Sequence, residues 1–148
     1  MKFFLLTLRL CLAVFQRVSY FLTLGMLPPF VSAVVVVRQG EKILMVERRD
    51  GRGYGLPGGY LKLDETVEAA AQREVLEETG LQVELVGVLG TLSGKRPGLW
   101  VSTVDIFYAG RVTGGELRGS REGRPCWVRL AEVRSQVAFD YLRILDRL

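Results

Sequence analysis

Residues 59–81 read GYLKLDETVEAAAQREVLEETGL and contain one helix together with the signals that start and stop it. Thr66 suits the N-cap, because its hydroxyl oxygen can accept a hydrogen bond from the first helical turn. Residues 67–79 have a helix-favouring composition, and Gly80 stands where glycine commonly ends a helix. We therefore predict a helix over residues 67–79.

Three glutamates of this helix share one face. At about 100° per residue, Glu77 and Glu78 lie about 300° and 400° around the axis from Glu74, so the three occupy an arc of about 100°. Three like charges this close repel one another, and a divalent cation that prefers oxygen ligands, such as Mg²⁺ or Mn²⁺, converts the repulsion into coordination. A solvated acidic face is the alternative, and these residues alone do not decide between the two.

The flanking sequence predicts strands and loops around the helix. We expect strands at 31–38 and 42–47 joined by a hairpin, a glycine-rich loop at 48–59, strands at 83–91 and 100–109 separated by a loop at 93–98, a loop at 110–125, a short strand at 126–129, and closing helical material at 131–148. Strands mixed with a central and a terminal helix indicate an α/β or α+β sandwich.

The chain contains no histidine among its 148 residues. This removes the usual general base, the imidazole metal ligand and every Ser-His or Cys-His nucleophile pair, so catalysis would rest on carboxylates, Lys, Arg, Tyr or Ser. Cys11 and Cys126 are too few for a zinc site or a disulfide framework. They suit a reducing compartment, and we predict a cytoplasmic protein.

The net charge of +4 belongs to the N-terminal segment. Residues 1–40 carry Lys2, Arg9, Arg17 and Arg38 with no Asp or Glu, whereas the other 108 residues hold 16 basic and 16 acidic side chains, which cancel. This split argues against a basic nucleic-acid-binding domain, so no specific nucleic-acid binding is expected.

The same segment is apolar and rich in phenylalanine. On a helix, Lys2, Arg9, Gln16 and Thr23 recur every seven positions beside a broad apolar remainder, and Pro28-Pro29 ends the helix. We predict an amphipathic helical extension over residues 1–30 and the main domain over 31–148. The helix could pack on the domain, pair with a second copy as a homodimer, or attach to a membrane surface; a membrane span or signal anchor is the remaining alternative.

Residues 59–81 resemble the signature of the Nudix hydrolases, the MutT-like family. That signature is Gly, five residues, Glu, seven residues, Arg-Glu, an aliphatic residue, any residue, Glu-Glu, any residue, Gly and an aliphatic residue, and every fixed position is met. The chance frequency of such a match is on the order of 10⁻⁸ per start position. The lead-in YGLPGG at 54–59 is also similar to the one usual in the family.

The resemblance implies an α/β/α sandwich around a mixed β-sheet. It also implies functional roles for the residues that occupy the fixed positions of the signature. Glu74, Glu77 and Glu78 match its metal-binding glutamates, and Arg73 matches the arginine that holds the catalytic carboxylates. The structural positions of the motif are Gly59, Glu65 and Gly80. A later carboxylate often joins the metals in this family; Glu122 resembles it, with Glu116 and Asp105 as weaker candidates. The predicted metal ligands are thus Glu74, Glu77, Glu78, Glu122 and Gly58, and the predicted catalytic residues are Arg73, Glu74, Glu77, Glu78 and Glu122.

The reaction implied by the resemblance is hydrolysis of a nucleoside diphosphate linked to another moiety, by attack of metal-activated water at one phosphorus. Metal cations neutralise the phosphate oxygens, and a carboxylate, Glu74 or Glu122, accepts the proton. ADP-ribose, a nucleoside triphosphate and a dinucleoside polyphosphate are all compatible substrates. The alternative is a Nudix-like module that senses a nucleotide and joins a membrane or partner through its N-terminal helix.

Several loop residues are candidates for substrate contact. Arg48, Arg49, Arg52, Lys95 and Arg96 could hold phosphate. Tyr54, Trp100 and Phe107 could stack on a base, although we expect them in the core. Cys126 beside Trp127 is interpreted as a small buried apolar residue rather than a reactive thiol.

Overall fold

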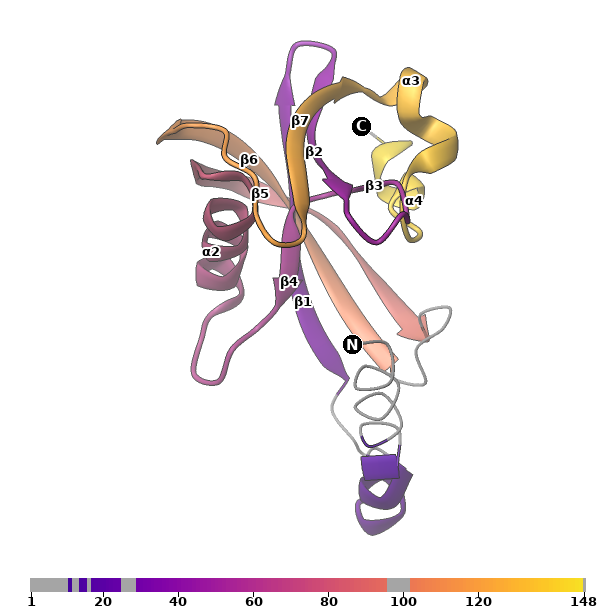
Figure 1. Cartoon of the computed structure of the whole chain (residues 1–148). Coiled ribbons are helices and arrows are strands. Elements are labelled where there is room, and N and C mark those ends of the chain that lie inside the picture. The colour runs from indigo at the N-terminus through magenta and orange to yellow at the C-terminus, as the bar shows by residue number, and fades with distance from the viewer. Residues whose placement is uncertain (1–10, 12–13, 16, 25–28, 96–101, 148) are drawn as a thin grey trace.

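The structure, a computed structural model, describes residues 11, 14–15, 17–24, 29–95 and 102–147 (Figure 1). Its elements are β1 (Phe30–Gln39), β2 (Lys42–Arg48), β3 (Tyr54–Gly55), β4 (Gly58–Tyr60), α2 (Val67–Thr79), β5 (Leu81–Lys95), β6 (Ser102–Gly115), β7 (Gly123–Arg129), α3 (Leu130–Val133), the 3₁₀ turn η1 (Arg134–Gln136) and α4 (Leu142–Leu145).

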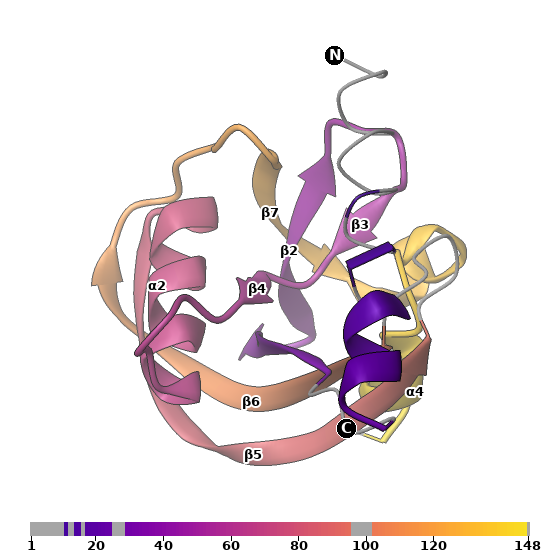
Figure 2. The same ribbon diagram turned by 90° about the horizontal axis from the view of Figure 1, so that it is seen from below.

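The described strands form one mixed sheet of seven strands. Its main order is β3-β2-β1-β6-β5, with β4 also pairing with β1 and β7 with β2. The pair β1 and β6 is parallel, and the other pairs are antiparallel. Figure 2 shows α2 on one side of the strands and α4 on the other. The predicted α/β/α sandwich around a mixed sheet is therefore confirmed.

Two apolar layers cover the two faces of the sheet, because successive side chains of a strand point to opposite faces. On one face, Val35 and Val37 of β1 pack with a cluster that includes Ala70, Ala71 and Val75 of α2. The small alanines let α2 approach the sheet closely. On the other face, the cluster is formed by Val34, Val36, Phe107, Tyr141, Ile144 and their neighbours. The carboxylates of α2 are thus anchored by a buried helix face.

Helix α2 confirms the predicted bounds at both ends. The Thr66 hydroxyl oxygen accepts a hydrogen bond of 3.2 Å from the Ala69 backbone N–H. Gly80 has φ 76°, in the left-handed region, and its N–H donates to the Leu76 carbonyl oxygen. A Cβ at Gly80 would also stand 2.4 Å from the Glu116 carbonyl oxygen, so both backbone conformation and space require glycine here.

The predicted loops at 48–59 and 110–125 were too long. The first contains β3 and the start of β4, which pair with β2 and β1. Strands this short are held by backbone hydrogen bonds and leave no apolar alternation to detect. The second is shortened because β6 extends to Gly115 and β7 begins at Gly123. The closing segment contains short helices and a 3₁₀ turn rather than one continuous helix.

Strand β5 forms one edge of the sheet, and its pairing with β6 is irregular. The register shifts between Gln82 and Val83, between Leu85 and Gly87, and between Val88 and Gly90. Val86 and Val88 lie next to these shifts and are 68% and 61% exposed.

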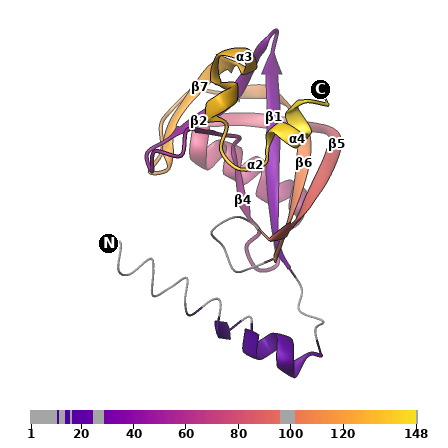
Figure 3. The ribbon, with the colours of Figure 1, turned by 90° about the vertical axis from the view of Figure 1, so that its right-hand side faces the viewer.

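The N-terminal segment is helical at residue 11, at 14–15 and at 17–22, and it forms a turn at 23–24. Figure 3 shows these residues standing apart from the sheet and from α2. Of the rest of the predicted extension over residues 1–30, Pro29 has no regular structure and Phe30 already begins β1. The other positions, including the predicted helix stop at Pro28, lie outside the described residues. Within the described part of the chain, no helix combines the length and apolarity needed to cross a membrane.

Candidate active site

Arg73 is the centre of a hydrogen-bond network that joins α2 to the loop before it. Its Nε donates to Glu65 over 2.7 Å and its Nη2 donates to Glu65 over 2.8 Å. Its Nη1 donates to Glu74 over 2.5 Å and to Glu77 over 3.2 Å. The Tyr60 carbonyl oxygen accepts a further bond from Nη2. One guanidinium group therefore ties the loop before the helix to Glu74 and Glu77, two of the three signature glutamates (Glu74, Glu77 and Glu78), which we call the box glutamates.

The network is largely shielded from water, which strengthens its charge interactions. The side chains of Arg73, Glu65 and Glu74 are only 18%, 14% and 13% exposed. The Arg73 hydrogen bonds, with a second from the Lys62 backbone N–H, lower the pKa of Glu65 to about 2. The carboxylates of Glu65 and Glu74 in turn raise the pKa of Arg73. Glu65 thus stays ionised as a fixed counter-charge that holds Arg73.

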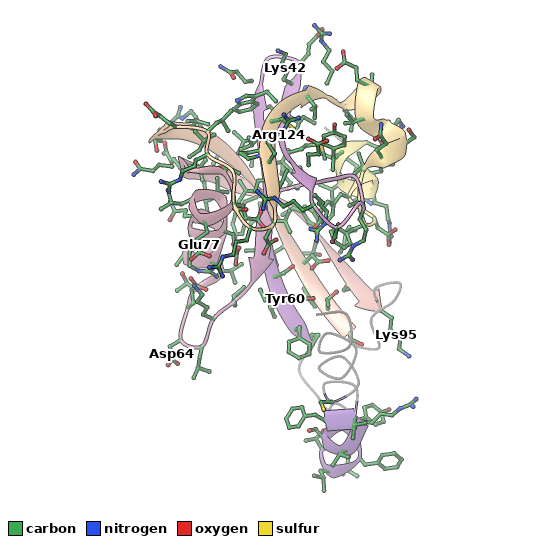
Figure 4. All side chains as sticks on the ribbon, in the orientation of Figure 1. Lys42, Tyr60, Asp64, Glu77, Lys95 and Arg124 are labelled. Atoms are coloured by element: carbon green, nitrogen blue, oxygen red, sulfur yellow. The ribbon has the colours of Figure 1, made fainter. Side chains whose placement is uncertain are left out.

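Glu77 lies at the solvent side of this network. Its side chain is 52% exposed, and Lys62 Nζ donates to it over 3.3 Å. Figure 4 shows Glu77 on α2 and Asp64 at the tip of the loop that leads into the helix. Of the three box glutamates, Glu77 is the most open to an incoming ligand.

Glu78 is the most buried of the box carboxylates. It is 6% exposed, and its Oε2 accepts a hydrogen bond of 3.1 Å from the Gly58 backbone N–H. Burial raises the pKa of Glu78, and a side-chain hydrogen bond with Glu122 raises it further. Burial also raises the pKa of Glu74, partly offset by its hydrogen bond from Arg73. Two neighbouring carboxylates are therefore held where a positive charge would stabilise them.

Glu122 comes to this site from the loop before β7. The Arg49 N–H donates to the Glu122 carbonyl oxygen over 3.0 Å, and the Glu122 N–H donates to Ser120 Oγ. The charge of Glu122 acts on both Glu78 and Glu74. The structure thus brings together Glu74, Glu78 and Glu122, which are far apart in sequence.

The two weaker candidates for a later carboxylate lie elsewhere. Asp105 accepts a hydrogen bond from Ser32 and points to the same sheet face as Phe107, opposite to α2. Glu116 is exposed, with its carbonyl oxygen against Gly80.

The donor chemistry of the cluster suits a hard divalent cation. All candidate side-chain ligands are carboxylate oxygens, the donors that Mg²⁺ and Mn²⁺ prefer. In the part of the chain that the structure describes, no three acidic or thiol side chains converge into a complete metal-binding group as they lie. Glutamate side chains rotate about several bonds, so a cation could gather oxygens that now contact Arg73 and Lys62.

The candidate phosphate-binding arginines are held together by an acidic residue that the sequence did not indicate. Asp50 accepts hydrogen bonds from Arg48 Nη2 and from Arg52 Nε, both over 2.8 Å. These bonds, the Arg48 bond first, lower the pKa of Asp50. The two guanidinium groups also lie over the Phe139 ring, 5.3 and 5.7 Å from its centroid. The charge of Glu122 reaches Arg48, so this group adjoins the carboxylates.

The other substrate candidates separate into three groups. Tyr54 is half-buried in β3 and packs against the apolar cluster on the sheet face away from α2, the cluster that includes Tyr141 and Ile144. Phe107 is fully buried, as expected for a core residue. Lys95 lies at the far end of β5, away from α2 (Figure 4), where it lines a pocket with Asp105 and Phe139. The predictions for Arg96 and Trp100 fall outside the described residues.

Cys126 is half-buried, and burial raises the pKa of its thiol.

Sequence reasoning missed Asp50, Phe139 and the contact between Glu78 and the Gly58 N–H. Asp50 follows two arginines in an exposed turn, a pattern without a distinctive signal. Phe139 has φ 59°, an uncommon conformation for a residue with a side chain, and nothing in the sequence marks it.

Comparison with known proteins identifies the family of this chain. The NUDIX family model, described as the NUDIX domain, matches residues 27–148. A MutT-like protein of Streptomyces ambofaciens is 37% identical over 126 residues, which are 82% of this chain and 79% of the relative. An ADP-ribose pyrophosphatase of Methanocaldococcus jannaschii is 30% identical over 122 residues, 80% of this chain and 72% of the relative.

Solved structures have the same fold. A NUDIX hydrolase from Nitrosomonas europaea superposes with TM-score 0.66 at 26% identity, covering 74% of this chain and 78% of that one. An ADP-ribose pyrophosphatase from Streptococcus suis gives TM-score 0.60 at 28% identity, covering 70% of this chain and 76% of that one. These matches define the fold as that of the NUDIX hydrolases. The chain belongs to the Nudix family.

Proposed function

We propose that this protein is a metal-dependent hydrolase that cleaves the pyrophosphate bond of a nucleoside diphosphate linked to another moiety. The observation that carries the proposal is the juxtaposition of Glu78, Glu74 and Glu122, of which the first two have pKa values raised by burial. The ionised form of a buried carboxyl group is unfavourable without positive charge nearby, and a bound divalent cation would compensate its negative charge.

Glu74, Glu77, Glu78 and Glu122 are the residues that would hold Mg²⁺ or Mn²⁺, with the Gly58 backbone beside them. When bound, the cation neutralises the diphosphate oxygens and lowers the pKa of a water molecule. Arg73 keeps Glu65 and Glu74 in place through its hydrogen bonds. Glu74 or Glu122 would accept the proton of the attacking water. The water oxygen bonds to one phosphorus, the bridging P–O bond breaks, and the other phosphate leaves with the group attached to it.

A chain of neighbouring groups leads from the carboxylates to the pocket on the other sheet face. Glu122 acts electrostatically on Arg48, Arg48 lies over Phe139, and Phe139 lines the pocket with Tyr141. We propose that the diphosphate lies at the carboxylates and Arg48, and that an attached group extends toward this pocket. ADP-ribose and oxidised purine nucleotides are the first substrates to test, because relatives carry the names ADP-ribose pyrophosphatase and 8-oxo-dGTP diphosphatase.

The test is hydrolysis by the purified full chain of ADP-ribose, 8-oxo-dGTP, ordinary nucleoside triphosphates and a dinucleoside polyphosphate, each with Mg²⁺, Mn²⁺ or EDTA. Glu77→Gln and Glu78→Gln are expected to lower kcat by about 10² or more, because they remove charge at the cation site. Glu84→Gln is the matched control, since Glu84 pairs with Arg111 on the exposed side of β5.

Turnover in EDTA, or full activity in both box variants, would contradict the proposal. Tight binding of one nucleotide without turnover of any would favour the nucleotide-sensing module instead.

A further inference from the structure

An apolar stripe runs along the helical residues near the N-terminus, ahead of the 27–148 region that matches the family model. At about 100° per residue, its members fall within an arc of about 120°. These members, which we call the N-terminal stripe, are Val14, Phe15, Val18, Phe21 and Leu22. Each of these side chains is between 53% and 80% exposed. The stripe is therefore an apolar surface presented to solvent.

Polar residues lie on the other side of this helix, which also carries the exposed Leu24 in its terminal turn. Arg17, Tyr20 and Thr23 fall outside the apolar arc, and the Thr23 hydroxyl donates to the Ser19 carbonyl oxygen over 2.8 Å. Figure 3 shows that the stripe-bearing helix stands clear of the sheet and of α2. The described helical residues are thus amphipathic, and no described element of the domain covers their apolar side.

Charge distinguishes the partners that could cover the stripe. Ahead of β1 the sequence holds three basic residues, Lys2, Arg9 and Arg17, and no acidic one, whereas residues 30–148 hold 17 basic and 16 acidic side chains, which nearly cancel. Two such helices pairing from two copies would bring together segments of like charge. An anionic lipid surface provides both an apolar interior for the stripe and negative headgroups for the basic residues.

We propose that the N-terminal stripe binds the surface of a membrane that contains anionic lipids. The helix lies in the plane of the interface, with Phe15 and Phe21 inserted among the acyl chains and Arg17 on the headgroup side. Membrane binding then requires both apolar contact and opposite charge, so it depends on lipid composition and on salt.

Two further exposed aromatic residues lie where the chain enters the domain. Phe30, the first residue of β1, is 40% exposed and Tyr60 of β4 is 42% exposed. Their rings meet edge to face, with centroids 6.0 Å apart. The Tyr60 ring, which is apolar with a hydroxyl at its tip, suits the headgroup region of a bilayer, and the Phe30 ring adds apolar area beside it. This pair gives the domain a second apolar contact at the end of β1 that follows the helix.

The test is co-sedimentation of the full chain with two kinds of vesicle, phosphatidylcholine alone and phosphatidylcholine mixed with phosphatidylglycerol. We expect binding to the mixed vesicles that falls at high salt, and at least about tenfold weaker binding to the neutral ones. The double variant Phe15→Asp/Phe21→Asp should lose binding by about tenfold or more with an unchanged thermal unfolding midpoint.

The matched control is Val86→Asp/Val88→Asp, which changes two equally exposed apolar residues on β5 and should bind vesicles like the parent chain. Equal binding to both vesicle types, or undiminished binding by Phe15→Asp/Phe21→Asp, would overturn the proposal. Sedimentation velocity without lipid gives the remaining decisive result. A dimer that this double variant disrupts, in a chain that binds no vesicles, would show that a second copy covers the stripe.

Discussion

The backbone of Gly59 leaves the space that the Glu74 carboxylate occupies. A Cβ built on Gly59 would stand 2.6 Å from both Cδ and Oε1 of Glu74. This contact connects the glycine of the Nudix signature directly to a carboxylate of the site. The glycine is required there by a neighbouring side chain, since its φ is not in the left-handed region.

Gly59→Ala is therefore expected to impair catalysis more than stability. The added methyl group meets the end of a flexible side chain, which can move at small energetic cost, so the free energy of unfolding should change by about 1 kcal/mol or less. Displacing Glu74 should lower kcat by about tenfold or more. Steady-state kinetics and thermal unfolding measure the two effects. Gly87→Ala is the control, because nothing lies within 4 Å of a Cβ there, and wild-type kcat in Gly59→Ala would disprove the contact's importance.

Arg73→Lys tests whether catalysis and stability need the several hydrogen-bond donors that the planar guanidinium group presents at once. Lysine keeps the positive charge but cannot donate simultaneously to Glu65, Glu74 and the Tyr60 carbonyl oxygen. We expect kcat to fall by about 10² and the free energy of unfolding to fall by about 1–3 kcal/mol, because partly buried carboxylates lose partners.

The control for this substitution is Arg111→Lys. Arg111 pairs with Glu84, but the two side chains are 71% and 56% exposed, so the free energy of unfolding should stay essentially unchanged. If Arg73→Lys had as little effect as this control, Arg73 would not be needed to hold Glu65 and Glu74 in place.

The Glu78 carboxyl should make the metal-free protein less stable as pH rises. Burial, together with Glu122, raises the pKa of Glu78 to about 9 in the folded chain, against an ordinary value of 4.5. The folded state therefore binds this proton more tightly than the unfolded state. The resulting stabilisation is complete below about pH 4.5 and is lost progressively as pH rises toward about 9.

Thermal unfolding in EDTA between about pH 5 and pH 9 measures this dependence. Glu78→Gln should flatten it, and Mg²⁺ should stabilise the parent chain most at the alkaline end, where the carboxylate is ionised. A parent chain in EDTA with the same pH profile as Glu78→Gln would contradict the raised pKa.

Glu122→Gln is expected to raise the Mg²⁺ concentration for half-maximal activity by about tenfold or more, since it removes one of the clustered carboxylates. The charge of Glu122 also raises the pKa of Glu78, so the variant should lose less stability at alkaline pH. Metal titrations of activity give the first quantity and unfolding curves give the second. Glu116→Gln, in the same connecting loop, should leave both unchanged; an equal effect of the two variants would remove Glu122 from the proposed metal site.

The sequence predicted the helix and its carboxylate face because their causes are local. Thr66 and Gly80 cap the helix through their own side chain and backbone, and 3.6 residues per turn places Glu74, Glu77 and Glu78 together. The proximity of Glu122 depends on the β2–β7 pairing, so only the family resemblance indicated it. Strands β3 and β4 escaped prediction because each consists of two or three residues held by backbone pairing.

The arginines show the limit of reading residue types without tertiary structure. Arg48 and Arg52 were candidates because loop arginines can hold phosphate, but Asp50 and Phe139 now restrict their positions. The aromatic partner comes from a residue 91 positions after Arg48, and no local pattern connects the two.

The three register shifts of β5 bear on how the protein behaves when concentrated. A long, regular edge strand is a template for pairing with another chain, and Val86 and Val88 would add apolar contacts to such an encounter. Each shift bends the strand and interrupts the even row of backbone donors and acceptors. These irregularities discourage edge-to-edge aggregation, and substitutions that straighten β5 would be expected to make the protein precipitate.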